Sequence, residues 1–357
     1  MRRDRPHRVS QADVARAAKV SAGIVSSVIN DRDYGSIRVS DATRERVWAA
    51  VRELGYVPNL AARSLARGSN RLIGVFTYQP VFPSTSRDFY HDFLMGVEDA
   101  AEEAAYNLLL VTGARTPSGD RSIFAGGVNN LQLADGAVLL GAGESRDELA
   151  RMAAENYPFV YIGQRRPEGV ELSFVAADYH GGTAAIVRRL AELGHRRIAM
   201  IQEAGAGEPV PGRRPGFLAG CREAGIDDAD RPLLTLARDN VADDVGKVED
   251  LDALIALAAR ESITAMVVER TDTAMAVRAA ALRAGRSVPG DLSILTLTVP
   301  PEPADDPGLA HLMIPRREMG REAVRILLEL LSATDSGPIR TTLACGFDPG
   351  DTVAPPT

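Results

Sequence analysis

Short apolar runs alternate with longer amphipathic stretches from about residue 72 to the end of the chain. The apolar runs predict strands with the sequences LIGVF, NLLLVT, GAVLLG, FVYIG, RIAMI, AMVV and SILTL. The stretches with helical periodicity predict helices at Asp92–Ala105, Asp147–Asn156, Gly182–Leu193, Pro215–Ala224, Asp250–Ala259, Thr273–Ala284 and Met319–Leu331. Because alternating strands and helices form parallel sheets with right-handed crossovers, we predict an α/β region. So many strands favour two doubly wound lobes over a single sheet.

The first thirty residues carry a different pattern, in which two short helices are joined by a tight turn. Ser10 and Asp13 have the Ser-x-x-Asp spacing of a capping box, which predicts a helix at Gln11–Ala18. After the turn, Ser21 is the predicted N-cap of a second helix at Ala22–Ile29. Such a pair is typical of a helix-turn-helix, although its spacing alone fits a plain helical hairpin equally well.

A third helix is predicted from its N-cap, Ser40, to Leu54, with Gly55 as the residue that ends it. Its core-facing side chains are expected to be Val47, Trp48, Val51 and Leu54. A further helical pattern covers only Leu60–Arg67. Isolated helices shorter than about 12–15 residues are marginal in water, so we expect this segment to be a linker that folds only when it is docked.

Charge separates the head of the chain from the rest. Residues 1–71 hold fourteen Lys and Arg against seven Asp and Glu, a net charge of +7, whereas the remainder holds 27 against 41, a net charge of −14. A basic end on an acidic body indicates a polyanionic partner for that end, which favours DNA binding over a plain hairpin.

Composition excludes several other classes of protein. No apolar run is long enough for a membrane span, and the N-terminal residues lack the apolar region of a secretory signal. The two cysteines, Cys221 and Cys345, have no metal-ligand spacing and fit a reducing cytoplasm. We therefore expect a cytoplasmic protein without metal or cofactor and without a membrane partner.

Three segments carry a more specific resemblance: ADVARAAKVS, RVSDATRERVWAAVRELGYVPNLAARSLARG and RLIGVF. Together they resemble the head of the LacI/GalR (lactose-repressor) family of transcriptional regulators. The resemblance implies an all-α helix-turn-helix head with a hinge helix, followed by two Rossmann-like lobes of the periplasmic-binding-protein type I kind, and no enzymatic activity. The implied domains are residues 1–57 (DNA-binding), 58–70 (hinge helix and linker), 71–194 plus 312–333 (N-terminal effector-binding lobe) and 195–311 plus 334–357 (C-terminal effector-binding lobe).

In that family the second helix enters the major groove, and a leucine of the hinge helix wedges between base steps in the minor groove. The resemblance assigns DNA binding to Ser21, Ala22, Gly23, Ser26 and Ser27, and to Asn59, Ala62 and Leu65 of the hinge. This chain departs from the family pattern, because Ala22 and Gly23 cannot make bidentate base contacts and Ser27 replaces a longer polar side chain. We expect Arg32 and Arg38, in an unusually long loop, and the basic N-terminal arm to compensate through phosphate or minor-groove contacts.

The resemblance also places a small-molecule effector between the two lobes. Arg213 lies in RRPGF, which matches the family pattern Arg-x-x-Gly-Phe whose arginine binds the effector. Arg115 follows a predicted strand at a place where some members use an arginine. Phe89 and Tyr90 match an aromatic segment after the first strand. A surface role for Arg213 and a core-filling role for the two aromatic residues remain open.

Two expected polar groups of the effector site are missing. After AMVV the family usually has Asn-Asp, but this chain has Arg270-Thr271, and Thr298 stands where an aspartate is usual. Arg270 together with Arg213 and Arg115 favours an anionic ligand, such as a phosphorylated or carboxylated metabolite, over a neutral sugar.

The implied working unit is a homodimer, or a higher assembly, because a twofold protein matches a palindromic double-stranded operator. We expect a ligand-responsive repressor associated with the nucleoid, and the sequence leaves open whether the ligand releases or promotes DNA binding. A first alternative is a solute-binding protein with the same two lobes, which the basic head argues against. A second is a nucleotide-dependent enzyme, for which Gly141 and Gly143 are only a weak match to the dinucleotide motif.

Overall fold

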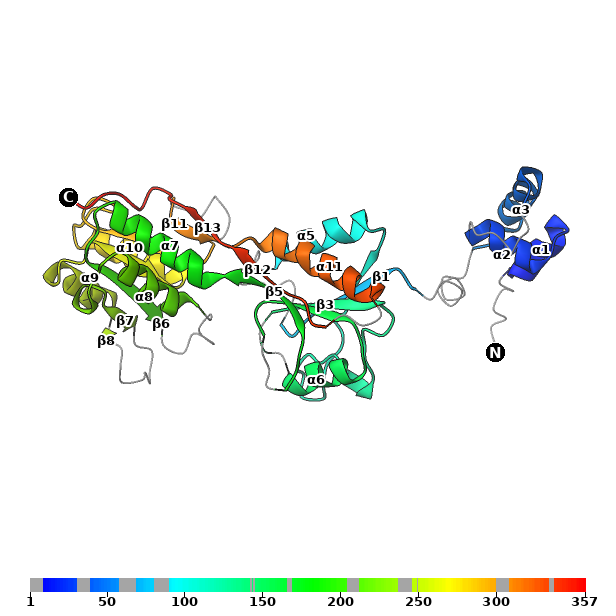
Figure 1. Ribbon diagram of the computed structural model, residues 1–357, viewed down its shortest axis with the longest axis horizontal. Coiled ribbons are helices and arrows are strands. Elements are labelled where there is room, and N and C mark those ends of the chain that lie inside the picture. Colours follow the sequence, from blue (N-terminus) through cyan, green and yellow to red (C-terminus); the bar gives the residue numbers. More distant parts are fainter. Residues whose placement is uncertain are drawn as a thin grey trace, which may run out of the picture. The chain divides into compact units, whose positions relative to one another are not determined.

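The computed structural model describes residues 9–30, 39–57, 69–79, 90–141, 143, 145–165, 169–203, 212–236, 246–248, 250–299, 308–333 and 337–357. Contacts divide the chain into two compact units, which are residues 1–72 with 133–135, and the rest of the chain. In Figure 1 the helices of the first unit are blue, and the α/β lobes of the second run from cyan to red. No helix in the described part of the chain is long and apolar enough to cross a bilayer.

The first unit contains three helices, α1 (Gln11–Ala18), α2 (Ala22–Asn30) and α3 (Asp41–Leu54). They confirm the three helices predicted from the sequence. The capping box is present at the start of α1, where the backbone N–H of Ser10 donates to the Asp13 carboxylate (2.9 Å) and the N–H of Asp13 donates to the Ser10 hydroxyl (3.4 Å). α3 ends at Gly55, whose φ of +61° is a conformation that glycine adopts without a Cβ clash.

Small apolar side chains from all three helices form the core of the first unit. They are Val14, Ala15, Ala18, Val25, Val28, Val47, Ala50 and Val51. The prediction that Trp48 belongs to this core is wrong, because its side chain is 40% exposed. Val47 and Val51 are one turn apart and face inward together, which turns the intervening Trp48 toward the rim.

The first lobe of the second unit is built on a six-stranded sheet. Its strands are β1 (Leu72–Thr77), β2 (Asn107–Leu110), β3 (Gly136–Leu140), β4 (Phe159–Ile162), β5 (Ser173–Asp178) and β12 (Arg340–Ala344), in the order β12-β5-β4-β3-β1-β2. β1, β3, β4, β5 and β12 pair in parallel, as expected for an α/β lobe.

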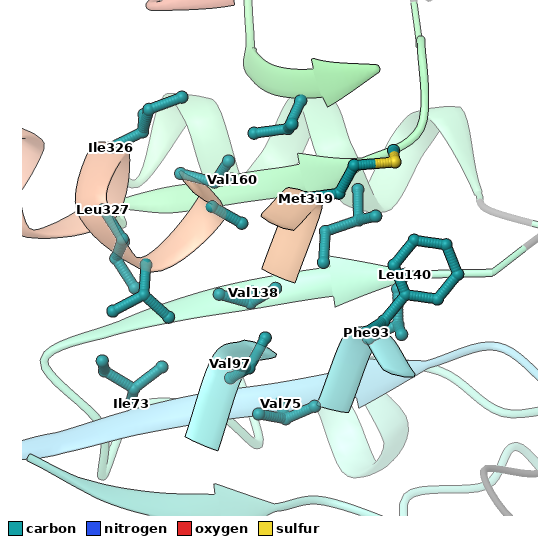
Figure 2. Close-up of a cluster of buried hydrophobic side chains, with 14 of the residues drawn as sticks. Ile73, Val75, Phe93, Val97, Val138, Leu140, Val160, Met319, Ile326 and Leu327 are labelled. Carbon is teal, nitrogen blue, oxygen red and sulfur yellow. The ribbon is translucent and has the colours of Figure 1, made fainter. Parts of the chain in front are cut away.

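Helices cover both faces of this sheet. α5 (His91–Glu103) and α11 (Arg316–Ser332) pack on one face, side by side although more than 200 residues separate them in sequence (Figure 1). Figure 2 shows their side chains, among them Phe93 and Met319, meeting the strand residues. α6 (Arg146–Ala154) contributes to the core on the opposite face.

The second lobe is built on a seven-stranded sheet. Its strands are β6 (Ile198–Glu203), β7 (Leu233–Leu236), β8 (Gly246–Val248), β9 (Ala265–Val268), β10 (Ser293–Thr296), β11 (Ala310–Met313) and β13 (Gly346–Asp348), in the order β13-β11-β10-β9-β6-β7-β8. α7 (Tyr179–Glu192) and α8 (Arg213–Glu223) contribute to one core, and α9 (Leu251–Arg260) and α10 (Thr271–Arg283) to the other. Only β13 pairs antiparallel among the described strand pairs.

The chain passes between the two sheets at three places, two of which differ from the predicted domain boundaries. β5 ends in the first sheet at Asp178, but α7 packs on α8 of the second lobe, so this passage precedes the predicted one at residue 194. The return near Ile314 lies close to the predicted residue 312. β12 lies in the first sheet and β13 in the second, which puts the last passage at Cys345 and not at residue 334.

Candidate DNA-binding head and ligand-binding strand ends

The predicted DNA-reading residues of α2 differ in how much surface they present. Ser21 and Ala22 are exposed, and Gly23 and Ser26 are half-buried. Ser21 also caps the helix, because its hydroxyl accepts the backbone N–H of Ile24 (3.3 Å). Ser27 is only 5% exposed, and its burial in the head counts against a base contact by its hydroxyl. Few side chains of this helix were expected to contact bases, and the burial of Ser27 leaves one fewer.

Several predicted residues lie outside the described parts of the chain. They are Arg32 and Arg38 of the long loop, Asn59, Ala62 and Leu65 of the hinge, and Phe89 of the aromatic segment. Their assignments remain predictions.

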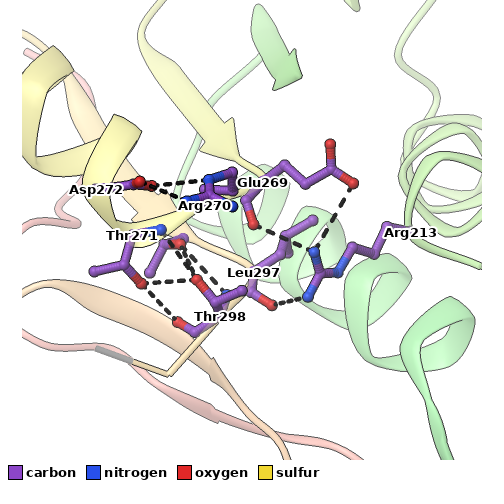
Figure 3. Close-up of polar contacts among 8 residues, drawn as sticks. Arg213, Glu269, Arg270, Thr271, Asp272, Leu297 and Thr298 are labelled. Atoms are coloured by element: carbon purple, nitrogen blue, oxygen red, sulfur yellow. Dashed lines mark hydrogen bonds and ion pairs between the residues drawn. The ribbon is translucent and has the colours of Figure 1, made fainter. Parts of the chain in front are cut away.

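Arg213 lies where several strands of the second lobe end. It is the first residue of α8, and its guanidinium group reaches the carboxyl ends of β9 and β10 (Figure 3). It donates to the backbone carbonyls of Glu269 (3.3 Å) and Leu297 (2.9 Å), and its Nη1 is 3.8 Å from the Glu269 carboxylate. The carboxyl ends of parallel strands are where α/β proteins bind ligands. This position supports the predicted role of Arg213 over a surface role, because the residue is buried.

The groups around Arg213 offset part of the cost of burying its charge. Burial lowers the pKa of the guanidinium group, and the nearby Tyr179 and Glu269 oppose that change. The carbon of the guanidinium lies 5.2 Å from the centre of the Tyr179 ring. The Nε–H of Arg213 is buried and donates to no described residue. Buried polar groups are almost always hydrogen-bonded, so this N–H lacks a partner that such groups usually have.

Arg270 has a different environment from Arg213. It is the N-cap residue of α10, and it makes a two-pronged pair with Asp272 (3.0 and 2.6 Å) on the exposed surface. This pair lowers the pKa of the Asp272 carboxyl, chiefly through the Arg270 hydrogen bond. The guanidinium charge of Arg270 is thus compensated within the protein.

Threonine hydroxyls stand after β9 and β10, where the resemblance implies amide and carboxylate groups. The Thr298 hydroxyl accepts the backbone N–H of Thr271 (3.0 Å) and lies 2.7 Å from the Thr271 hydroxyl and 3.1 Å from that of Thr296 (Figure 3). The side chain that follows β10 therefore caps α10. Hydroxyl groups both donate and accept hydrogen bonds, which suits a neutral polar ligand.

In the first lobe, the strand ends gather a second polar cluster around Tyr90. The ring of Tyr90 packs in the core and its hydroxyl donates to the side chain of Gln79 (3.0 Å), so the core-filling interpretation holds and a ligand contact stays a prediction. Gly141 follows β3 with a φ of +99°, and a Cβ there would lie within 3 Å of the Tyr90 hydroxyl and of Thr77 Oγ1. Only glycine leaves room for these hydroxyls at the end of the strand.

Arg121 reaches this cluster, and Arg115 lies opposite it in an isolated antiparallel bridge, so a ligand-binding role of Arg115 stays a prediction. Arg115 is exposed and donates to the Gly119 carbonyl (2.6 Å) within its own loop. Arg121, which the sequence analysis missed, donates to the backbone carbonyls of Thr77 (3.3 Å) and Gln79 (3.0 Å) after β1. Burial is the main cause of the lowered pKa of Arg121. No periodicity marks Arg121, whereas Thr77 and Glu269 directly follow predicted strands and could have been found.

Comparisons with known proteins cover nearly the whole chain. Residues 11–59 match the family described as bacterial regulatory proteins, lacI family, and residues 187–353 match the periplasmic binding protein-like domain. The chain is 32% identical to the HTH-type transcriptional regulator CelR of Thermobifida fusca, over 95% of this chain and 97% of that protein. It is 30% identical to the HTH-type transcriptional repressor CytR of Escherichia coli (strain K12), over 93% of both.

Solved structures agree with this likeness. A complex of the transcriptional regulator CelR with cellobiose superposes with a TM-score of 0.58 at 27% identity, over 97% of this chain and 100% of that one. The Lac repressor dimer bound to operator and the anti-inducer ONPF gives a TM-score of 0.70 at 21% identity, over 97% and 99% of the two chains, and shows the shared fold. These relatives are transcription regulators and not enzymes. This chain has the helical head and the two α/β lobes, and it is 32% identical to CelR over 95% of its length. It therefore belongs to the LacI family of bacterial transcription regulators.

Proposed function

We propose that this regulator is a repressor that binds a palindromic operator as a homodimer and is controlled by a small molecule at the strand ends of its two lobes. The observation that supports it most is the joining of a capped helix-turn-helix head of net charge +7 to lobes whose strand ends carry buried polar groups. The relative CytR is named a repressor, and the Lac repressor structure is a dimer on operator DNA. The work would take place in the cytoplasm, at the nucleoid.

For DNA recognition, we propose that the head relies on backbone and minor-groove contacts more than on α2. Ser27 is buried and Ala22 has no polar side-chain atom, so few groups of α2 can read base edges. Arg32 and Arg38 then supply phosphate or minor-groove contacts, and Leu65 wedges between base steps. The hinge, Asn59 to Arg67, folds when two copies grip one kinked duplex, which couples the lobes to DNA affinity.

For the ligand, we propose a neutral molecule rich in hydroxyl groups, such as a sugar. Arg270 is paired with Asp272 and Arg213 lies beside Glu269, so the charges of the second-lobe cluster compensate each other. The argument for an anionic ligand depended on three guanidinium groups without such partners, and one of them, Arg115, lies in its own loop. The hydroxyls of Thr271 and Thr298 and the cellobiose in the CelR structure support a sugar.

DNA binding is tested with a palindromic duplex selected by the full-length protein from a random pool. We expect affinity to fall at least tenfold between 50 and 200 mM salt, because each neutralised phosphate releases counterions. Leu65→Ser and the pair Arg32→Ala with Arg38→Ala should each weaken selective binding at least tenfold. Selective affinity that all of these variants retain would refute the proposed mode of binding.

Ligand binding is tested by calorimetry with cellobiose, ribose and glucose 6-phosphate. We expect a neutral sugar to bind most tightly, with a loss of affinity of about tenfold or more in Arg213→Ala, since a charged hydrogen bond to a ligand is worth about 1.5–3 kcal/mol. The matched control is Arg270→Ala, for which a change below about threefold is expected. Preference for glucose 6-phosphate that disappears in Arg270→Ala would instead establish an anionic effector.

A further inference from the structure

The three residues that precede β1 are held by one carboxylate. Asp135 accepts the hydroxyl of Ser69 (2.6 Å) and the backbone N–H groups of Asn70 (2.6 Å) and Arg71 (2.9 Å). Two hydrogen bonds close the same loop from the other side, from the Asn70 side chain to the Leu133 carbonyl (2.8 Å) and from the backbone N–H of Asp135 to the Leu72 carbonyl (2.8 Å). Residues 69–71, which end the tether between the head and β1, thus form one hydrogen-bonded loop closure with residues 133–135. We call this closure the knot, and it lies within the first compact unit.

The knot imposes a backbone conformation that the chain would otherwise avoid. Arg71 has a φ of +52°, in the left-handed region that is unfavourable for residues with a Cβ. The Ser69 hydroxyl also accepts the N–H of Arg71 (3.2 Å), so the turn is bonded from within as well as to Asp135. A strained residue of this kind persists only where surrounding bonds over-determine it. The direction of the chain just before β1 is therefore set by Asp135.

Pairing in the sheet does not require this arrangement. β1 and β3 already pair in parallel, with Ile73 opposite Gly136 and four further pairs along the strands. The ladder fixes the register of both strands beyond the knot. The bonds to the Asp135 carboxylate act on residues 69–71, which connect the sheet to the hinge segment that precedes them.

We propose that Asp135 is a positioning residue that fixes the point from which each hinge segment starts, and so sets the spacing of operator half-sites that a dimer accepts. This inference rests on the proposed binding of a palindromic operator by two heads. In a dimer, two anchored tethers start at a fixed separation, and operator geometry must match it. Without the anchor, three more residues join each tether, and heads on longer flexible tethers tolerate a wider range of spacings.

The test is a series of duplexes in which the two selected half-sites are moved apart or together by one to three base pairs. We expect the full-length wild-type protein to bind one spacing at least tenfold more tightly than the others. In Asp135→Ala this preference should fall below about threefold, with most of the change at the preferred spacing. Asp135→Asn, which keeps one acceptor oxygen, should give an intermediate preference.

The matched control is Asp291→Ala in the second lobe. Asp291 accepts the backbone N–H and the hydroxyl of Ser287 (both 2.7 Å), a loop closure of the same chemistry far from β1 in sequence. This variant should keep the tenfold preference. Asp135→Ala should also keep wild-type affinity for the sugar found by calorimetry, a readout that a general loss of structure would change.

If Asp135→Ala does not fold, the double variant Ser69→Ala with Asn70→Ala removes three of the hydrogen bonds of this loop and must reduce the preference in the same way. A folded Asp135→Ala, or failing that the double variant, with the wild-type preference would overturn the inference. So would a wild-type protein that binds the selected half-sites without any preferred spacing. A wild-type protein that binds no duplex selectively would overturn the proposed function itself.

Discussion

At the scale of single residues, the partners of a charged group decide its role more than its presence in the sequence does. Arg213, Arg270 and Arg115 look equivalent as letters, yet one is buried at strand ends, one is paired with a neighbouring aspartate, and one bonds its own loop. Counting guanidinium groups therefore suggested an anionic ligand, whereas their contacts led us to propose a neutral one. The reactivity of the Cys345 thiol depends on its surroundings in the same way.

Cys345 should react slowly with alkylating reagents near neutral pH. Burial raises the pKa of its thiol from 9.0 to about 11, with the Asp178 carboxylate adding to the effect. Only the thiolate attacks, so the two-unit rise makes the reactive fraction about a hundredfold smaller at pH 8 and restores it as the pH approaches 11. Mass-spectrometric rates of iodoacetamide labelling between pH 7 and 10.5 measure this.

Cys345→Ser provides the control for that experiment. The remaining Cys221 is fully buried and its pKa is also raised to about 11, so the variant should stay unlabelled until it unfolds. Rapid labelling of native Cys345 at pH 7.5 would contradict the environment described here.

At the scale of elements, close approach between helices depends on particular glycines. α5 and α11 cross where Gly96 faces the Arg317 backbone carbonyl and Gly320 faces that of Phe93. The side chain of Arg317 points away from the crossing and pairs with Asp99 (2.7 Å). This is one of several ion pairs along the solvent side of the two helices. The glycines set the distance between the helices, because exposed ion pairs contribute little by themselves.

Gly96→Ala should destabilise the first lobe by about 1–3 kcal/mol, since overpacked sites force the backbone to shift. A Cβ at this position would overlap the Arg317 carbonyl oxygen. Gly113→Ala is the matched control, because a Cβ there meets nothing within 4 Å and the residue is exposed. Urea unfolding followed by far-UV circular dichroism compares the two. Equal midpoints for both variants would show that the crossing tolerates a larger separation.

At the scale of the whole molecule, the chain consists of a small helical unit and a larger α/β unit with separate cores. Among the described residues, the buried apolar side chains in the core of the small unit are valine and alanine, whereas the lobes bury phenylalanine, tyrosine and methionine. Stability grows with the apolar area that a unit buries, so the head should be the less stable of the two.

Thermal unfolding should therefore show two transitions. Trp48, the only tryptophan of the chain, lies on α3 and is partly exposed, so its fluorescence reports the head. Circular dichroism is dominated by the lobes. We expect the fluorescence midpoint to come first and to rise when selected operator DNA is added, because a ligand stabilises the unit to which it binds. Coincident midpoints in both signals would indicate that the head and the lobes unfold in one cooperative transition.

The sequence by itself determined the local and chemical outline of this protein. Capping residues and helical periodicity predicted the three head helices, and the apolar runs predicted seven strands of the two sheets, because these signals depend on neighbours within a few residues. The resemblance of segments between residues 12 and 76 predicted the family, which the comparisons confirm. Arg213 was also singled out in this way, since its motif is contiguous, and its ligand-binding role stays a proposal.

Only the tertiary structure decided what depends on contacts between distant segments. β7, β8, β11, β12 and β13 were missed, because strands of three to five residues without a long apolar run gain their definition from a neighbour in the sheet. β5 was missed as well, although its six residues include the apolar run FVAA. The lobe to which α7 belongs, the place of Arg121 beside β1 and the closure of residues 69–71 on Asp135 are likewise decided across many residues of chain. Periodicity shows that a face is buried, but not against which partner.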